Sequence, residues 1–346
     1  MRLIEPLGLL DGPEAEACVA AGLAFRLGHT GLAFTLVRLI DWDHGTDRVE
    51  RAADLAPPWR ERLEELAKPP TAWAGMPLSR PAVMGIVNVT PDSFSDGGER
   101  LRAEDAIAAG EEMAKAGADI LDIGGESTRP GSFPVPAQEE QARILPVIRS
   151  LAGLGLPISV DTRNAATMAA ALDNGATIIN DVSALQHDPD ALATVAKREC
   201  SLVLMHMRGT PSDMAAHANY RDVAVEVTLE LAERVAAAER AGIDRARIAV
   251  DPGIGFAKNS VQNLMLLRRL PLLMNLGCTI LVGLSRKRFL AGYSGGAGPK
   301  QRGPASLAGG LFALARGARV LRVHDVAETI QAVRTWHGLT RPALMP

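Results

Sequence analysis

Eight short apolar runs recur along the chain from residue 82 onward, and most of them are followed by a polar, helix-forming stretch. Each run is apolar on both faces, which is typical of parallel strands that helices cover on two sides. The runs are 82–89, 118–125, 156–161, 177–182, 201–207, 247–253, 279–285 and 319–326. Amphipathic stretches at 103–118, 139–153 and 224–242 predict helices between them. Eight such units fit a (β/α)₈ barrel, and a doubly wound open sheet is the alternative.

The strand-like runs share a second feature, because each is apolar at its start and ends in a hydrogen-bonding or ionisable group. These groups are Asn88, Asp122, Asp161, Asn180, His206, Asp251, Ser285 and Arg322. A single Asp or Asn after a strand is usually the N-cap of the next helix. Eight consecutive strands that end this way need a different explanation. In a parallel barrel the strand ends meet at one mouth, so the sequence predicts a polar site there.

The first 80 residues follow another pattern. Two short strands are expected within 22–40, an amphipathic helix covers 58–68, and 71–81 reads as a linker. We therefore divide the chain into an N-terminal appendage of unknown role, residues 1–80, and a catalytic barrel domain, residues 81–346.

Composition narrows the class of protein. The 346 residues contain 37 Lys and Arg against 40 Asp and Glu, a formal net charge of −3, which argues against a nucleic-acid partner. No run of 18 apolar residues predicts a membrane span, and acidic residues interrupt any secretory signal near the N-terminus. The three cysteines have no metal-binding spacing and suit a reducing compartment, so we expect a cytoplasmic protein.

Three loops carry the chemistry. In GIVNVTPDSFSDGGE (85–99), Asn88 lies inside an apolar strand, where its amide needs partners. GADILDIGGESTRPGS (117–132) combines glycines with a hydroxyl and a guanidinium that suit phosphate oxygens. In LVGLSRKRFL (281–290) three cations follow Ser285, where they oppose the dipole of a helix start. Cations at that point predict an anionic or electron-rich ligand.

These loops, together with segments 158–162, 178–184, 204–211, 251–258 and 322–326, closely resemble the motifs of the dihydropteroate synthase family. The motifs occur in the same order as in the family and span residues 82–335. Residues 1–80 show no such resemblance. It implies a (β/α)₈ barrel that joins 6-hydroxymethyl-7,8-dihydropterin pyrophosphate to 4-aminobenzoate, giving 7,8-dihydropteroate and pyrophosphate in folate synthesis. Sulfonamides, which mimic aminobenzoate, target this family.

The resemblance also implies roles for individual residues. The pterin would be bound by Asp161, Asn180, Met205, Asp251 and Lys287. The diphosphate would be held by Asn88, Thr128, Arg129, Arg322 and His324. Aminobenzoate would lie near Thr128, Pro130, Phe256, Ser285 and Lys287. The residues expected to act in catalysis are Asp161, Lys287, Arg322 and His324. Asn88 would be the protein ligand of a Mg²⁺ cofactor, and family members are commonly homodimers.

Two alternatives share the barrel. A pterin-dependent methyltransferase domain of the corrinoid type would read the pterin edge similarly, but it gives no reason for the cations at 286–288 or for the terminal Arg322 and His324. A catalytically degenerate pterin-binding barrel would have lost the diphosphate-side residues, which this chain keeps. Ser285 and Lys287 are expected to face the ligand, whereas Arg286 and Arg288 are expected to turn outward or toward neighbouring loops.

Overall fold

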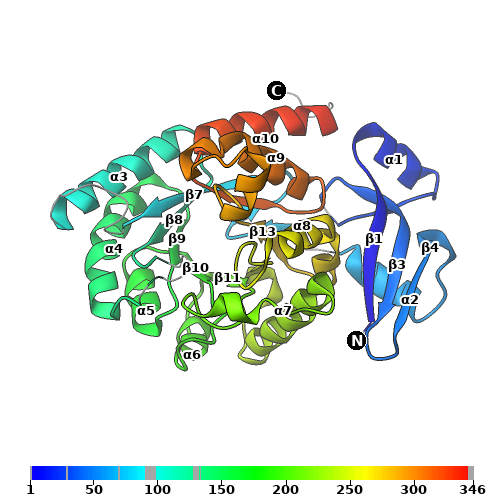
Figure 1. Ribbon diagram of the computed structural model, residues 1–346, viewed down its shortest axis with the longest axis horizontal. Helices are drawn as coiled ribbons and strands as arrows, with labels where there is room; N and C mark the ends of the chain where they lie inside the picture. The colour runs from blue at the N-terminus through cyan, green and yellow to red at the C-terminus, as the bar shows by residue number, and fades with distance from the viewer. Residues whose placement is uncertain are drawn as a thin grey trace.

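Eight parallel strands close into a barrel in the order β10-β11-β12-β13-β14-β7-β8-β9 (Figure 1). The computed structural model describes residues 2–28, 30–68, 71–89, 99–127, 132 and 134–341, with 99–102 as backbone only. The strands are β7 (Ala82–Asn88), β8 (Ile120–Gly124), β9 (Ile158–Asp161), β10 (Ile178–Asp181), β11 (Ser201–Met205), β12 (Ile248–Asp251), β13 (Thr279–Val282) and β14 (Val320–Val323). All eight predicted strands are confirmed, and closure excludes the open sheet.

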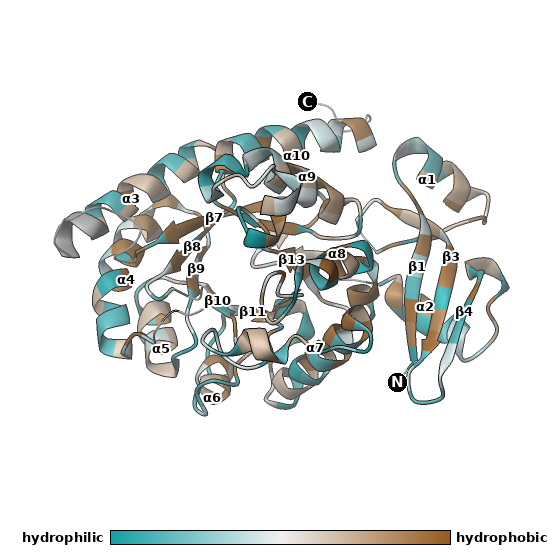
Figure 2. Ribbon diagram, in the orientation of Figure 1, coloured by the Kyte–Doolittle hydropathy of each residue, from teal (hydrophilic) through white to brown (hydrophobic). Residues whose placement is uncertain are grey.

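Helices surround the barrel, so each strand is buried between them and the barrel interior (Figures 1 and 2). Ile120 and Leu121, for example, point to opposite faces of β8 and both are fully buried. The helices are α3 (Glu99–Lys115), α4 (Ala137–Leu151), α5 (Ala165–Asp173), α6 (Ala191–Ala196), α7 (Val223–Arg240), α8 (Ser260–Arg268), α9 (Gly303–Leu314) and α10 (Val326–Thr340). No described helix combines the length and apolar character that a bilayer crossing requires.

Short 3₁₀ segments complete the connections. They are η1 (Ala52–Asp54), η3 (Ala152–Leu154), η4 (Met214–His217), η5 (Arg245–Arg247), η6 (Leu270–Leu276), η7 (Arg288–Tyr293) and η8 (Pro299–Gln301).

The N-terminal residues form a separate antiparallel sheet beside the barrel (Figure 1). Its elements are β1 (Arg2–Leu10), α1 (Gly12–Ala20), β2 (Phe25–Arg26), β3 (Ala33–Asp41), β4 (Thr46–Arg51) and α2 (Trp59–Leu66). The two strands expected within 22–40 are confirmed as β2 and β3. The sheet is fastened to η6, because Ile4 N donates to Asn275 Oδ1 at 3.0 Å and Asn275 Nδ2 donates to Ile4 O at 2.7 Å.

Residues 71–81 are a packed element, so their reading as a linker was wrong. Strands β5 (Ala72–Trp73) and β6 (Met76–Pro77) form a small hairpin. Trp73 is only 1% exposed and packs with the first inward-facing residues of the barrel strands, among them Ile120, Ile178 and Val320. Its indole Nε1 donates to Arg247 O at 3.1 Å. The hairpin therefore closes the end of the barrel where the strands begin, opposite to the predicted site.

Candidate active site

Strand register brings the predicted polar residues side by side at the mouth of the barrel. Asn88 is opposite Gly124, Gly124 is opposite Asp161, and Asp161 is opposite Asn180. On the next pair of strands Met205 is opposite Asp251. Asp161, Asn180, Met205 and Asp251 are all buried, and Asn88 is half-buried. The carboxyl ends of the strands thus converge as the sequence predicts.

An arginine crosses the mouth and joins two buried carboxylates. Arg322 Nε donates to Asp122 Oδ2 at 2.6 Å, and Arg322 Nη2 donates to Asp161 Oδ2 at 2.8 Å. Asn180 Nδ2 also donates to Asp122 Oδ2, at 3.2 Å. The remaining oxygens, Oδ1 of Asp122 and Oδ1 of Asp161, have no hydrogen-bond partner among the described residues. A buried acceptor without a donor is costly, so these two oxygens are suited to the donors of a ligand.

Burial and charge set the protonation of this cluster. Burial raises the pKa of Asp161 to about 7, against the opposing pull of Arg322. Burial also raises the pKa of Asp251, which Lys287 opposes. The pKa of Lys287 moves the other way, lowered to about 8 by burial. Carboxylates and cations therefore share one poorly solvated site, which is a common property of active sites.

The loop after β12 forms one wall of the site with Lys287. Asp251 Oδ1 accepts from Gly253 N at 2.7 Å, which fixes the start of the loop. Gly253 has a φ of +66°, and a Cβ there would lie 1.9 Å from His206 O, so no side chain fits. Lys287 Nζ donates to Ile254 O and lies 4.5 Å from the centroid of the Phe256 ring. Two residues predicted for aminobenzoate, Phe256 and Lys287, are therefore in contact.

A buried lysine behind this wall was not predicted as part of the site. Lys258 Nζ lies 3.1 Å from Gly253 O, 2.9 Å from Phe256 O and 2.9 Å from His206 Nδ1. His206 Nε2 in turn lies 2.9 Å from Glu230 Oε2. Burial lowers the pKa of His206 to about 4, so the ring is neutral, accepting at Nδ1 and donating at Nε2. Lys258 thus holds the loop that carries Phe256; its place at the end of DPGIGFAK was the only sequence signal.

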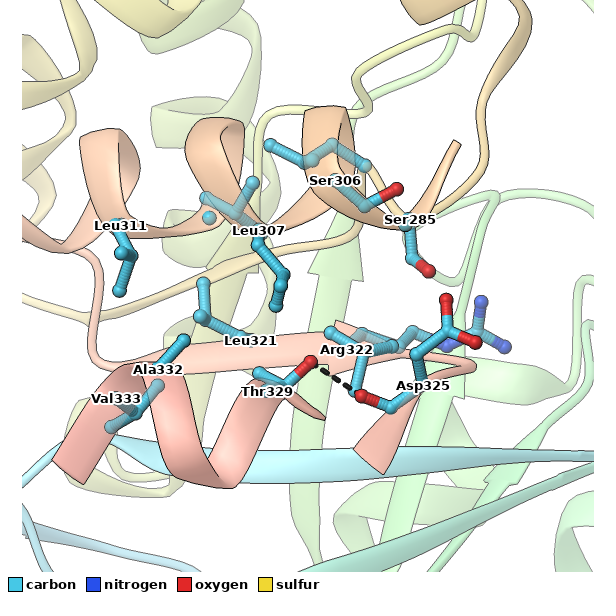
Figure 3. A pocket seen from close by; sticks show the side chains of 15 residues that line it. Ser285, Ser306, Leu307, Leu311, Leu321, Arg322, Asp325, Thr329, Ala332 and Val333 are labelled. Atoms are coloured by element: carbon cyan, nitrogen blue, oxygen red, sulfur yellow. Dashed lines mark hydrogen bonds between the residues drawn. The ribbon is translucent and has the colours of Figure 1, made fainter. Parts of the chain in front are cut away.

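Ser285 and His324 meet beyond the ends of the next two strands of the barrel, β13 and β14. Ser285 Oγ lies 3.2 Å from His324 N and 3.1 Å from His324 Nδ1. A pocket between α9 and α10 reaches this point: its apolar end contains Leu307, Leu311 and Val333, and Ser285 and Arg322 lie at its polar end (Figure 3). The structure therefore brings the predicted Ser285, Arg322 and His324 into one region. Thr128, Arg129 and Pro130 lie outside the described residues.

Comparisons with known proteins identify the family of this chain. A family model for pterin binding enzymes matches residues 84–324. The dihydropteroate synthase of Neisseria meningitidis serogroup C is 46% identical over 266 residues, which are 76% of this chain and 94% of that protein. Two solved structures of Xanthomonas albilineans dihydropteroate synthase each cover 78% of this chain and 96% of their own. The one with 4-aminobenzoic acid has a TM-score of 0.73 and 50% identity. The complex with 7,8-dihydropteroate has a TM-score of 0.68 and 44% identity. The chain therefore belongs to the dihydropteroate synthases of the pterin-binding enzyme family.

Proposed function

We propose that this protein condenses 6-hydroxymethyl-7,8-dihydropterin pyrophosphate with 4-aminobenzoate, giving 7,8-dihydropteroate and pyrophosphate, at the mouth of the barrel. The observation that carries this proposal is the buried cluster of Asp122, Asp161 and Arg322, in which two carboxylate oxygens lack donors among the described residues. A pterin presents an edge of alternating donors and acceptors that can supply them.

The pterin ring would be bound by groups at the ends of four neighbouring strands, β9 to β12, and by Lys287 in the loop after β13. Asp161 and Asp251 would accept from the ring's N–H groups, and Asn180 can both donate and accept. Lys287 would donate to ring acceptors, and the flat face would pack against Met205, which is buried at the end of β11. A ligand that lacks this edge would leave buried polar groups unpaired, so the arrangement favours pterins over isosteres.

The leaving diphosphate would lie toward Asn88, Arg322 and His324, with Thr128 and Arg129 contributing from outside the described residues. Asn88 also fits a Mg²⁺ ion, because its amide oxygen is a hard ligand and magnesium at phosphate sites takes few protein ligands. Among the described residues no group of three or more His, Cys, Asp or Glu is arranged to hold a metal. When bound, Mg²⁺ would neutralise charge on the departing diphosphate.

The acceptor, 4-aminobenzoate, would approach from the wall made by Phe256 and Lys287. Ser285 would lie near the carboxylate of the aminobenzoate. An arylamine is already unprotonated at neutral pH, so the step needs no strong general base. The pterin ring can support a cationic methylene, so we favour an SN1-like path in which diphosphate leaves before the amine attacks. The task of the protein is then to position both substrates and to stabilise the leaving charge.

A direct assay tests this function. The purified protein is mixed with the dihydropterin pyrophosphate, labelled 4-aminobenzoate and Mg²⁺, and labelled pteroate is separated and counted. We expect label in pteroate that depends on both substrates. No product together with tight binding of a methylated folate would indicate a methyltransferase instead, and no product with pterin binding alone would indicate a degenerate barrel.

Removal of divalent cations should lower turnover about 100-fold, because the diphosphate would leave without its neutralising charge. Turnover is measured in excess EDTA and again after Mg²⁺ is restored. The Asn88→Ala variant should need more Mg²⁺ than the wild type to reach half of its maximal rate. Full activity in EDTA would contradict the metal assignment.

Pterin binding should weaken below about pH 7. Burial holds the pKa of Asp161 at about 7, so acidification protonates its carboxylate in the free protein and removes an acceptor for the ring. Calorimetric titration with 6-hydroxymethyl-7,8-dihydropterin, which carries no phosphate, should show affinity falling up to roughly tenfold per pH unit on the acid side. Asp161→Asn should bind more weakly and lose this dependence. Affinity that rises on acidification would refute the role of Asp161.

We also propose a homodimer. Phe312 on α9 is 37% exposed and Leu339 on α10 is 77% exposed, which supports a contact surface on these late helices. Light scattering on the protein as it elutes from a size-exclusion column should give twice the mass of one chain. Replacing Leu339 by Glu should shift the measured mass toward that of the monomer. A monomer for the wild type would rule the proposal out.

A further inference from the structure

Arg286 is held in an unusual backbone conformation between the two site residues Ser285 and Lys287. Its φ is +59°, in the left-handed region that is unfavourable for a residue with a side chain. Its N–H donates to Ser306 Oγ at 2.9 Å, and its carbonyl oxygen accepts from Arg302 Nη1 at 2.9 Å. Ser306 Oγ also donates to Arg302 O at 2.8 Å, so the start of α9 holds both backbone groups of Arg286.

The side chain of Arg286 reaches the loop that follows β14. Its Nε donates to Asp325 Oδ2 at 3.1 Å, and its Nη2 binds the other oxygen of the same carboxylate. This two-point pair between a guanidinium and a carboxylate is specific in direction as well as charge. Both side chains are mostly buried, 26% and 21% exposed. Asp325 makes no capping hydrogen bond to α10, so its carboxylate serves Arg286 rather than the helix.

The pair continues a connection already present one residue earlier. Ser285 contacts His324, and Arg286 binds Asp325, so two consecutive residues of one loop are joined to two consecutive residues of the other. Ser285, Ser306 and Asp325 lie at the same end of the pocket between α9 and α10 (Figure 3). The loop after β13 carries Lys287, whereas the loop after β14 carries His324 and begins just beyond Arg322.

We propose that Arg286 is a positioning residue: its ion pair with Asp325 fixes the loop of Lys287 against the loop of His324. The left-handed turn lets Ser285 face His324 while Lys287 turns toward Ile254 O and the Phe256 ring. Glycine would adopt this φ without strain, so an arginine here indicates that the side chain is needed. The proposal rests on the function given above and deepens it. One ion pair would align the loop of Lys287, which faces pterin and aminobenzoate, with the loop of His324, which faces the diphosphate.

A double-mutant cycle tests the coupling. Arg286→Ala and Asp325→Ala should each lower kcat/KM for aminobenzoate about tenfold, as expected for displaced binding groups, and the double variant should be no worse than either single one. Arg286→Gly removes both the backbone strain and the side chain. It should therefore lose as much activity as Arg286→Ala, while its unfolding temperature should equal or exceed that of Arg286→Ala. Arg286→Lys should recover only part of the rate, since a lysine ammonium cannot reproduce the planar two-point pairing of a guanidinium with a carboxylate. Arg245→Ala is the control, because Arg245 makes a similar two-point pair with Glu239 before β12 begins.

A second readout does not depend on activity. Hydrogen exchange of the backbone amides over residues 283–290 should speed up in Asp325→Ala, because the Arg286 N–H loses the constraint that aligns it with Ser306. Exchange over the same residues should stay unchanged in Arg245→Ala. If the wild-type protein forms no pteroate, the proposed function is wrong, but the hydrogen-exchange measurement still tests the ion pair. Additive kinetic losses in the double variant, or unchanged exchange in Asp325→Ala, would overturn the positioning role of Arg286.

Discussion

Replacing Lys287 by alanine is expected to lower turnover at least about 100-fold, on the scale of other electrostatic contacts in active sites. Lys287 contacts Ile254 O and the Phe256 ring, and its positive charge opposes the raised pKa of Asp251. Its removal takes away the donor that we propose for the pterin, the cation beside Phe256 and part of the charge that compensates Asp251. The turnover number is measured by formation of labelled pteroate at saturating substrates.

The matched control for this variant is Lys300→Ala. Lys300 is an exposed lysine in η8, so its removal should leave turnover unchanged. Thermal unfolding of both variants separates loss of function from loss of fold. Near-wild-type turnover in Lys287→Ala would remove this residue from the mechanism.

Replacing Trp73 by alanine is expected to lower the free energy of unfolding by about 3–5 kcal/mol, the usual cost of deleting a large buried aromatic side chain. Trp73 is 1% exposed, closes the barrel where the strands begin, and donates to Arg247 O at 3.1 Å. Its loss would leave a cavity lined by the first inward-facing residues of the strands. Unfolding in urea, followed by circular dichroism, measures the change.

Trp73→Phe refills most of the cavity and should recover a large part of the stability. Activity per folded molecule should stay at the wild-type level in both variants, because the hairpin is at the opposite end of the barrel from Lys287. A loss of less than about 1 kcal/mol in Trp73→Ala would show that the hairpin does not close the barrel in solution.

The barrel could be predicted from the sequence because its signal is local and repeated. Strands covered on both sides must be apolar on both faces, and eight such runs leave few architectures. The hairpin at 71–81 could not be predicted in this way. Each of its strands has two residues, too few to show a period, and Trp73 finds its partners only after the barrel has closed.

The sequence predicts where the candidate site lies, but not which of its side chains contact one another. Asn180 and Asp181 are neighbours in sequence, yet only Asn180 contacts Asp122, whereas the Asp181 carboxylate accepts from Ser183 N and Leu185 N in its own loop. Side chains alternate along a strand, so these two residues face different ways, and the family resemblance rather than the strand pattern named Asn180 for the pterin. The diphosphate role of Arg322 stays a prediction; its pairing with Asp122, 200 residues away, is a contact that only barrel closure creates.

Arg286 illustrates the same limit at the backbone level. The sequence placed Arg286 outward or toward a neighbouring loop, and the structure confirms the second of these, since it binds Asp325. Its φ of +59° could not be anticipated, because local preference at that conformation favours Gly or Asn over Arg. Arg288 is exposed at the start of η7, and no described contact explains its charge.

The most direct test of the central claim is a crystal structure of the protein with 6-hydroxymethyl-7,8-dihydropterin pyrophosphate and Mg²⁺. The account predicts the amino edge of the pterin within roughly 2.7–3.2 Å of Asp161, Asn180 and Asp251, with the diphosphate toward Asn88, Arg322 and His324. A pterin bound elsewhere, with Asp161 and Asp251 making no contact to it, would contradict the account.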